Sequence, residues 1–334
     1  MSKNIFKADP LLDSALRPKN WQDFVGQEKV KKNLQIILEA AKKRKESPDH
    51  LLFYGPAGLG KTTLAYLIAF EMEANIKITS GPAIEKVGDV ASILTNLNEG
   101  DVLFIDEAHR LNKLIGEVLY SVMESRVLNL ILGKGPSART VQLELAPFTL
   151  IAATTRIGLL SNSLRSRFGA IFKLDFYEKE DIEKILRHNA KILEVEIGEE
   201  AIELLASASR ATPRVANRLL KRSRDLAIVE GDGVITQEIS KKSLELFEID
   251  EIGLEATDRK LLETIIDKFG GGPVGLGTLA AATNEERDTI EEVYEPYLMR
   301  LGFIERTPKG RVVADAGYKH LNLYNLKNKQ SKLL

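Results

Sequence analysis

Short apolar segments alternate with stretches of helical periodicity from about residue 33 to residue 176. The apolar segments are rich in β-branched and large aliphatic residues, as expected for strands that helices cover on both faces. This alternation predicts a parallel α/β sheet. The predicted strands are Leu51–Tyr54, Ile76–Thr79, Val102–Ile105, Thr149–Ala153 and Ile171–Asp175.

One segment interrupts the alternation. Two strand-like runs, Val127–Leu132 and Thr140–Leu145, flank the Gly/Pro turn Gly133–Arg139 and predict a β-hairpin that projects from the sheet. Alternating Leu and Ile side chains would leave apolar groups at an exposed edge, which favours a partner-binding hairpin over an ordinary surface hairpin.

The second half of the chain has two further patterns. Residues 178–248 are helical only and predict a small α-helical bundle. From about residue 251 we expect a helix, a glycine-rich linker, a short helix, a long helix at Glu285–Leu301 and a strand–turn–strand from Phe303. This is the order of a winged-helix domain. The predicted domains are residues 1–177 with a hairpin insertion at about 127–145, residues 178–250 and residues 251–334.

The amino-acid composition narrows the class of protein. The 334 residues are 44% hydrophobic and 28% charged, with a net charge of −1, so the whole chain is no general polycation for nucleic acid. Zero cysteines exclude disulfides and thiolate chemistry, and the four histidines show no zinc-ligand spacing. Without a long apolar run we expect no membrane span and no signal peptide, and we predict a cytoplasmic protein.

The strand Leu51–Tyr54 runs into Gly55-x-x-x-x-Gly60-Lys61-Thr62, which then opens a helix. Glycines let the backbone wrap a polyphosphate, so that amide N–H groups and the helix N-terminus point at it. Lys61 adds a charge on the outer phosphates, and the Thr62 hydroxyl is a ligand for Mg²⁺. The segment predicts binding of ATP or ADP with Mg²⁺.

A second strand, Val102–Ile105, ends in Asp106 and Glu107. The carboxyl ends of parallel strands face the ligand crevice, so Asp106 is predicted to share the Mg²⁺ site with Thr62. Glu107 is then placed to polarise a water for attack on the γ-phosphate. The alternative is that both acids only cap the following helix.

Three downstream motifs complete the predicted hydrolytic site. At the end of a further strand, the hydroxyls of Thr154 and Thr155 can orient the attacking water or cap a helix. Either threonine can be the residue that senses the nucleotide, and Thr155 is included among the predicted nucleotide contacts. Arg167 can place its charge on the γ-phosphate of a neighbouring subunit, or remain a solvated arginine. Arg214 starts a helix of the bundle and can report nucleotide state, or only decorate that helix.

In the third domain the long helix is acidic and phosphates would repel it, so insertion of a recognition helix is disfavoured. The basic wing is the better DNA surface, through contacts to phosphates that ignore sequence, although protein contacts are an alternative. From residue 300 on only Glu305 and Asp315 oppose eight basic residues: Arg300, Arg306, Lys309, Arg311, Lys319, Lys327, Lys329 and Lys332.

Together these motifs resemble the AAA+ ATPase family. DEAH helicases share the letters Asp-Glu-Ala-His, but their second recombinase-like domain and arginine-rich motifs are missing from this sequence. Within AAA+ the chain is similar, over about residues 11–325, to the bacterial motors that drive branch migration of Holliday junctions. The similar stretches are residues 15–27, 55–63, 106–110, 133–139, 152–156, 211–218 and 293–298.

The resemblance implies a hexameric ring that hydrolyses ATP, with Lys61, Glu107 and a neighbour's Arg167 as catalytic groups. It implies that the hairpin engages the junction-binding protein RuvA, that RuvC joins the resolving complex, and that Arg287, Arg306 and Arg311 contact four-way junction DNA. One departure is Met123–Arg126, which lacks the Glu-Asp-(Phe/Tyr) expected there. The nucleotide contacts that the resemblance implies are Leu16, Arg17, Gly58, Gly60, Lys61, Thr62, Thr63, Tyr177 and Arg214.

Two rival functions remain on the sequence alone. A clamp-loader-type switch shares the Ser-Arg-Phe neighbourhood of Arg167 but ordinarily lacks a winged helix. A nucleotide-gated DNA-binding regulator explains a winged helix on an ATPase, yet regulators often dispense with either the acid at Glu107 or the arginine finger. A protein unfoldase is disfavoured, because the segment Ile84–Gly88 lacks an aromatic residue to grip polypeptide.

Overall fold

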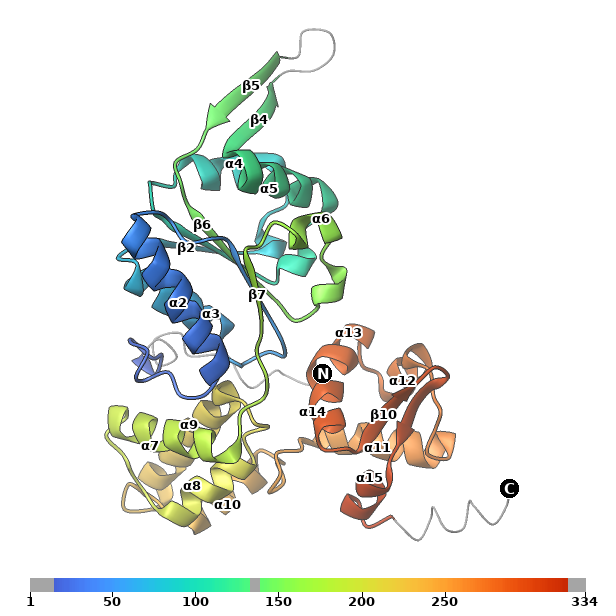
Figure 1. The fold of residues 1–334 in the computed structure, drawn as a ribbon. Coiled ribbons are helices and arrows are strands. Elements are labelled where there is room, and N and C mark those ends of the chain that lie inside the picture. Colours follow the sequence, from blue (N-terminus) through green and yellow to red (C-terminus); the bar gives the residue numbers. More distant parts are fainter. Residues whose placement is uncertain (1–14, 133–138, 324–334) are drawn as a thin grey trace. The chain divides into compact units, whose positions relative to one another are not determined.

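The computed structural model describes residues 15–132 and 139–323 (Figure 1). Residues 133–138 of the predicted turn and the tail lysines Lys327, Lys329 and Lys332 lie outside the described residues. The chain divides into two compact units. The first unit is residues 1–55 with 59–175, and the second is residues 56–58 with 176–334.

The first unit contains a five-stranded sheet in the order β2-β3-β6-β1-β7, in which every pairing is parallel. This confirms the predicted sheet, although β7 ends at Lys173, two residues before the prediction. Strand β6 is buried throughout and β3 is buried except at its last residue, Asp106, as their continuous apolar sequences require. The strands are β1 Leu51–Tyr54, β2 Ile76–Ser80, β3 Val102–Asp106, β6 Thr149–Thr154 and β7 Ala170–Lys173.

Helices of this unit cover the sheet through apolar stripes. In α5 (Lys113–Ser125), Ile115, Leu119 and Val122 recur at helical spacing and join the core that α4 and strands β3 and β6 build. Its start is fixed by Asn112, whose side chain accepts a hydrogen bond from Ile115 N–H. The other α-helices are α2 Glu28–Arg44, α3 Lys61–Glu71, α4 Val87–Thr95 and α6 Asn162–Arg165.

The predicted hairpin is confirmed as an antiparallel pair, β4 (Val127–Leu132) with β5 (Arg139–Glu144), and Figure 1 shows it extending away from the sheet. Its apolar side chains differ from the expectation. Leu128 is buried, and Leu130 and Leu143 pack against the core of the unit, because the base of the hairpin lies on α5. Fewer apolar groups are therefore available at its edge than the sequence indicated.

The second unit begins with the predicted helical bundle. One feature was missed: two-residue strands β8 (Glu196–Ile197) and β9 (Val234–Ile235) pair in parallel, a pairing too short for any sequence periodicity. The bundle helices are α7 Lys179–Ile192, α8 Glu199–Ser207, α9 Pro213–Glu230 and α10 Gln237–Leu246.

A winged helix follows in the same unit. The predicted long helix is interrupted: a π-helical turn at Ile290–Tyr294 separates α13 from α14 (Glu295–Arg300), just before Pro296, whose missing N–H breaks the α-helical hydrogen-bond pattern. The wing strands are β10 (Ile304–Thr307) and β11 (Gly310–Val313), and the remaining helices are α11 Ala256–Phe269, α12 Leu276–Thr283, α13 Arg287–Thr289 and α15 Asp315–His320. Helix α15 was not predicted.

The glycine-rich segment after α11 is a loop, as predicted, but it also pairs with the wing. Val274 N–H donates to Arg311 O at 2.9 Å and Arg311 N–H donates to Val274 O at 2.8 Å, so the segment pairs with β11 of the wing. Gly310 is needed there, because a Cβ on it would lie 2.3 Å from Val274 O. None of the helices in the described ranges has the length and apolar character to span a bilayer.

Candidate nucleotide site

The phosphate loop joins β1 to α3 through glycines with positive φ. Gly55 has φ 142° and Gly60, at the helix N-cap, has φ 98°. A side chain at Gly55 would also collide with Leu174 O, at 2.4 Å. Lys61 opens the helix with its side chain largely buried, and its Nζ donates to Gly55 O at 2.7 Å. The loop therefore presents the N–H groups of a helix start beside a buried ammonium, which is an anion site.

Three neighbouring strands end at the same edge as this loop. Tyr54 of β1 pairs in register with Thr154 of β6, and Ala152 of β6 pairs with Ile105 of β3. Asp106 closes β3 and its Oδ1 accepts from the Glu107 N–H at 2.9 Å. The predicted acids and hydroxyls of the first unit thus share the carboxyl edge of one sheet with the phosphate loop.

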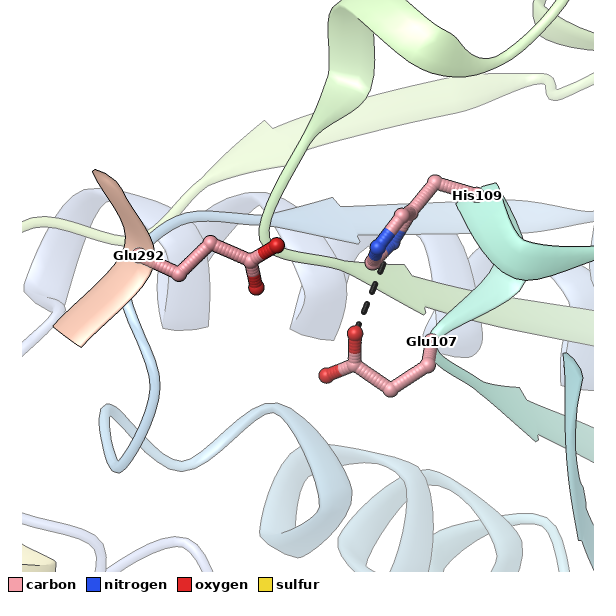
Figure 2. Close-up of side chains that lie close together, drawn as sticks. All are labelled: Glu107, His109 and Glu292. Atoms are coloured by element: carbon pink, nitrogen blue, oxygen red, sulfur yellow. Dashed lines mark ion pairs between the residues drawn. The ribbon is translucent and has the colours of Figure 1, made fainter. Parts of the chain in front are cut away.

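Glu107 follows the strand in the left-handed region, at φ 49°, which is uncommon for a residue with a side chain. Its Oε2 lies 3.5 Å from His109 Nδ1 (Figure 2). The same nitrogen lies 2.9 Å from Thr154 Oγ1. Thr154 Oγ1 also accepts from Arg156 N–H at 3.0 Å. Glu292, also drawn in Figure 2, belongs to the second unit.

No role for His109 was predicted from the sequence, although it lies in the family-like stretch 106–110. Its nearly buried imidazole joins the acid after β3 to the hydroxyl at the end of β6. The buried hydroxyl at this position is Thr154, whereas Thr155, predicted as a nucleotide contact, is half-buried one residue further on. The nucleotide role of either threonine stays a prediction.

The donor set suits magnesium. Thr62 lies in the first turn of α3 and Asp106 closes β3, two elements that contact each other within the first unit. Both side chains are half-buried and offer hard oxygen ligands, which Mg²⁺ prefers. The Thr63 side chain, in the same turn, is half-buried as well.

The segment before the first strand packs on the helix that follows the loop. Leu16 is buried, and the Arg17 guanidinium lies 4.0 Å from the centre of the Tyr66 ring on α3. This cation–π contact fixes the residues predicted to flank the adenine against the phosphate-loop helix. Their contact with the base itself remains a prediction.

Arg167 lies just after α6, and its contacts are on α5. The guanidinium donates to Tyr120 Oη, lies 4.4 Å from the centre of that ring, and is 2.9 Å from Glu124 Oε2. The hydrogen bond that the guanidinium donates to Tyr120 raises the pKa of Arg167. Sequence spacing gave no signal for these partners, and Glu124 belongs to the Met123–Arg126 segment that departs from the family pattern.

In the second unit Tyr177 is buried and its N–H donates to Ala211 O at 3.0 Å. Arg214 is exposed at the second position of α9. Gly58, which groups with this unit, lies against it: a Cβ on Gly58 would be 3.0 Å from Arg214 Cβ. The start of α9 therefore lies beside one glycine of the phosphate loop.

The wing arginines are not the unopposed charges that the sequence count indicated. Arg311 Nε lies 2.6 Å from Glu295 Oε1, and Arg306 Nη2 lies 2.5 Å from Glu295 Oε2. Arg306 Nη2 is also 3.4 Å from Glu291. Acids of the long helix neutralise these arginines because the helix packs behind the wing. The exposed Arg287 lies against Gly277, where a Cβ would be 2.7 Å from its guanidinium nitrogen.

A parallel sheet with a phosphate loop and an Asp-Glu pair at one strand edge, followed by a helical bundle, defines an AAA+ ATPase. Three family models match the chain: the Holliday junction DNA helicase RuvB P-loop domain at residues 16–174, the RuvB AAA lid domain at 177–250 and the RuvB C-terminal winged-helix domain at 251–322. The chain belongs to the RuvB family of branch-migration ATPases.

Individual relatives agree over nearly the full length. The chain is 55% identical over 335 residues to the Holliday junction branch migration complex subunit RuvB of Dehalococcoides mccartyi strain CBDB1, covering 100% of this chain and 96% of that protein. The solved RuvB Holliday junction branch migration motor of Thermotoga maritima is 51% identical with a TM-score of 0.85, covering 92% of this chain and 98% of that chain. A lysine-to-arginine mutant of the Thermotoga protein gives a TM-score of 0.86 at the same identity.

Proposed function

We propose that this protein is a ring motor, built of six copies, that hydrolyses ATP to move duplex DNA through Holliday junctions during recombination and repair. The observation that carries the proposal is the shared strand edge. The phosphate loop, Asp106 and Glu107 meet there, in a chain that matches a branch-migration subunit from end to end. Because its substrate is chromosomal DNA, we expect it to act in the bacterial cytoplasm.

Hydrolysis follows from the groups at that edge. Lys61 exchanges its bond to Gly55 O for the outer phosphates, and the first-turn amides of α3 hold the chain of phosphates. Mg²⁺ held by Thr62 and Asp106 would neutralise phosphate charge. Glu107 accepts a proton from the attacking water, and His109 holds its carboxylate toward Thr154. Burial of Thr154 fixes the position of that hydroxyl.

We propose that Arg167 acts in the site of a neighbouring copy. In this chain its guanidinium is held by Tyr120 and Glu124 of α5, so its bonds within the subunit go to that helix. A positive charge supplied by a neighbouring copy stabilises the transition state of phosphoryl transfer most, because negative charge develops on the γ-phosphate there. The active enzyme would then require adjacent copies in a ring.

Nucleotide state is read by the remaining predicted contacts. Leu16 and Arg17 would flank the adenine, and Tyr177 with Arg214 would sense the nucleotide from the second unit. Gly58 supports the last assignment, because it lies directly against Arg214. The domain boundaries at residues 177 and 250 remain part of this proposal.

DNA and protein partners would bind elsewhere. The hairpin β4–β5 is the proposed RuvA contact, since it extends from the sheet, and RuvC would join the resolving complex. Arg287, Arg306 and Arg311 are the proposed DNA contacts of the winged helix. Of the two wing arginines, Arg306 is the better candidate for a phosphate contact, since its side chain is 42% exposed and that of Arg311 only 14%.

A synthetic four-way junction with labelled arms tests the function. We expect ATP-dependent branch migration by the wild-type protein with RuvA, and none by Lys61→Ala, which keeps the fold but loses the phosphate contact. Arg306→Ala should weaken binding to any DNA sequence and lower the salt slope by about one. ATP hydrolysis that never moves the junction, with RuvA present, would contradict the proposal and favour a switch or regulator.

A further inference from the structure

One buried arginine connects the helical bundle to the winged helix. Arg210 lies in the loop before α9 and is 8% exposed, and its partner Asp258, in the first turn of α11, is fully buried. Arg210 Nη1 donates to Asp258 Oδ2, and Nη2 lies 3.4 Å from Oδ1. This is a two-pronged pair between residues 48 positions apart in the chain.

The same guanidinium contacts the winged helix at three further points, one of which is Gly253 O, to which Nη1 donates at 3.5 Å. Its Nη2 donates to Val293 O at 3.1 Å, within the π-helical turn of the long helix. Its carbon lies 4.7 Å from the centre of the Tyr297 ring, and the Tyr297 hydroxyl donates to Ile252 O at 2.5 Å. One side chain of the bundle thus contacts α11 and the long helix of the winged helix together.

Arg210 is also rigidly connected to the sensor position. It and Ala211 are consecutive non-glycine residues in the left-handed region, both at φ 54°. Ala211 O accepts the Tyr177 N–H, and the Thr212 side chain caps α9 two residues before Arg214. Backbone geometry this restricted leaves the loop little freedom to absorb a displacement.

Stability alone does not explain the pair. Burial raises the pKa of Asp258, and the opposing effect of Arg210 only partly offsets it. Buried ion pairs of this kind are often no more stabilising than apolar residues of the same volume, whereas they fix a single geometry. The arrangement therefore favours a role in orientation.

We propose that Arg210 couples the start of α9 to the winged helix, so that the two move together. A displacement of Arg214 then also moves the DNA-binding winged helix. The inference rests on the proposed function, because it takes Arg214 as the nucleotide sensor and the winged helix as the DNA contact. The proposed role of Arg210 is one of positioning, because it acts through its contacts with Asp258, Val293 and Tyr297.

The variants are chosen to keep the fold. Arg210→Met with Asp258→Leu removes both charges at similar volume, so no unpaired buried charge remains. Arg210→Lys keeps the charge but loses the fork that reaches Asp258 and Val293 together. Arg218→Gln is the matched control, because Arg218 lies on α9 and binds Glu255 of the same junction at 2.8 Å, but through a partly exposed pair.

Two measurements are made on the full-length protein. The chain has no cysteine, so nitroxides can be attached at Val229→Cys on α9 and Glu263→Cys on α11, both exposed. Electron–electron resonance then gives the distance distribution between bundle and winged helix. The second measurement is the number of base pairs migrated per ATP hydrolysed on a four-way junction with RuvA.

We expect a narrow distribution in the wild type and in Arg218→Gln, and a broad one in the double variant and in Arg210→Lys. ATP hydrolysis should stay within about twofold of wild type, while base pairs per ATP fall at least about fivefold. Unchanged distributions with an unchanged ratio would overturn the proposal, as would equal losses of hydrolysis and migration. If the wild type moves no junction, the proposed function fails, and the distance distributions still decide whether Arg210 couples the two parts.

Discussion

The two units of this protein form their functional sites from different kinds of groups. In the first unit the site lies at a sheet edge, where backbone amides, strand ends and adjacent residues such as Asp106 and Glu107 supply the groups. In the second unit the key junction is a buried ion pair, Arg210 with Asp258, between distant parts of the sequence. The nucleotide site therefore depends on motifs of residues close in sequence. The proposed coupling between bundle and winged helix depends on side chains that are distant in sequence and that the fold brings together.

The largest expected effect tests the local side of this comparison. Glu107→Gln keeps the phosphate loop but cannot take the proton from water, so ATP turnover should fall by about 10²–10⁴-fold with ATP affinity retained. Steady-state hydrolysis and equilibrium nucleotide binding measure the two quantities. Glu99→Gln, an exposed acid of the same unit, is the control and should hydrolyse normally. Normal turnover in Glu107→Gln would remove Glu107 from the mechanism.

The second effect tests the long-range side. Arg311→Ala deprives the fully buried Glu295 of one of its two arginines, and should lower the unfolding free energy of the second unit by roughly 3 kcal/mol. Adding Glu295→Gln should recover most of the loss, because the uncompensated charge is then gone. Urea unfolding followed by circular dichroism measures both.

A control for that experiment is built into the chain. The single tryptophan, Trp21, lies in the first unit, where its Nε1 donates to Glu71 at 3.2 Å. Its fluorescence transition should not shift in Arg311→Ala. A shift of both transitions together would show that the two units do not unfold independently, and the comparison between them would lose its basis.

The smallest effect is a pH dependence confined to the first unit. Burial lowers the pKa of His50 below its ordinary 6.5, and Leu150 N–H donates to its Nδ1 at 2.9 Å, which requires the neutral ring. Above pH 6.5 this contribution is complete. As the pH falls below 6.5 the unfolded chain binds a proton that the folded chain does not, so stability declines until the folded pKa is reached.

We expect the Trp21 transition to move to lower urea as the pH falls below 6.5. The free energy of unfolding should fall in total by about 1.4 kcal/mol for each unit by which folding lowers the His50 pKa. His50→Asn, whose amide oxygen can replace Nδ1 as the acceptor, should flatten that dependence. His188→Asn, in the second unit, should leave it as it is. An equal slope in the His50 variant would assign the acid sensitivity to other groups.

The same comparison explains what the sequence could predict. The parallel sheet follows from short apolar segments that alternate with helical stretches, and the hairpin and the bundle follow from periodicities of two and 3.6. The phosphate loop follows from glycines at fixed spacing, because all of these signals are local. The pairing of Val274 with Arg311 and the partners of Arg167 could not be predicted, because they depend on register between distant segments. The π-helical turn before Pro296 has a local cause, but it leaves no periodicity of its own, so the pattern predicted one continuous helix. Likewise, counting charges along the chain missed the ion pairs of Glu295.

The central claim is that ATP is cleaved between adjacent copies of this chain. It is tested most directly by mixing Lys61→Ala with Arg167→Ala, each expected to be inactive alone, and measuring ATP hydrolysis on junction DNA. Random mixing in equal amounts should create intact sites at about a quarter of the subunit interfaces, and hydrolysis should reappear in that proportion. A mixture as inactive as its components, although it assembles into rings, would contradict the claim.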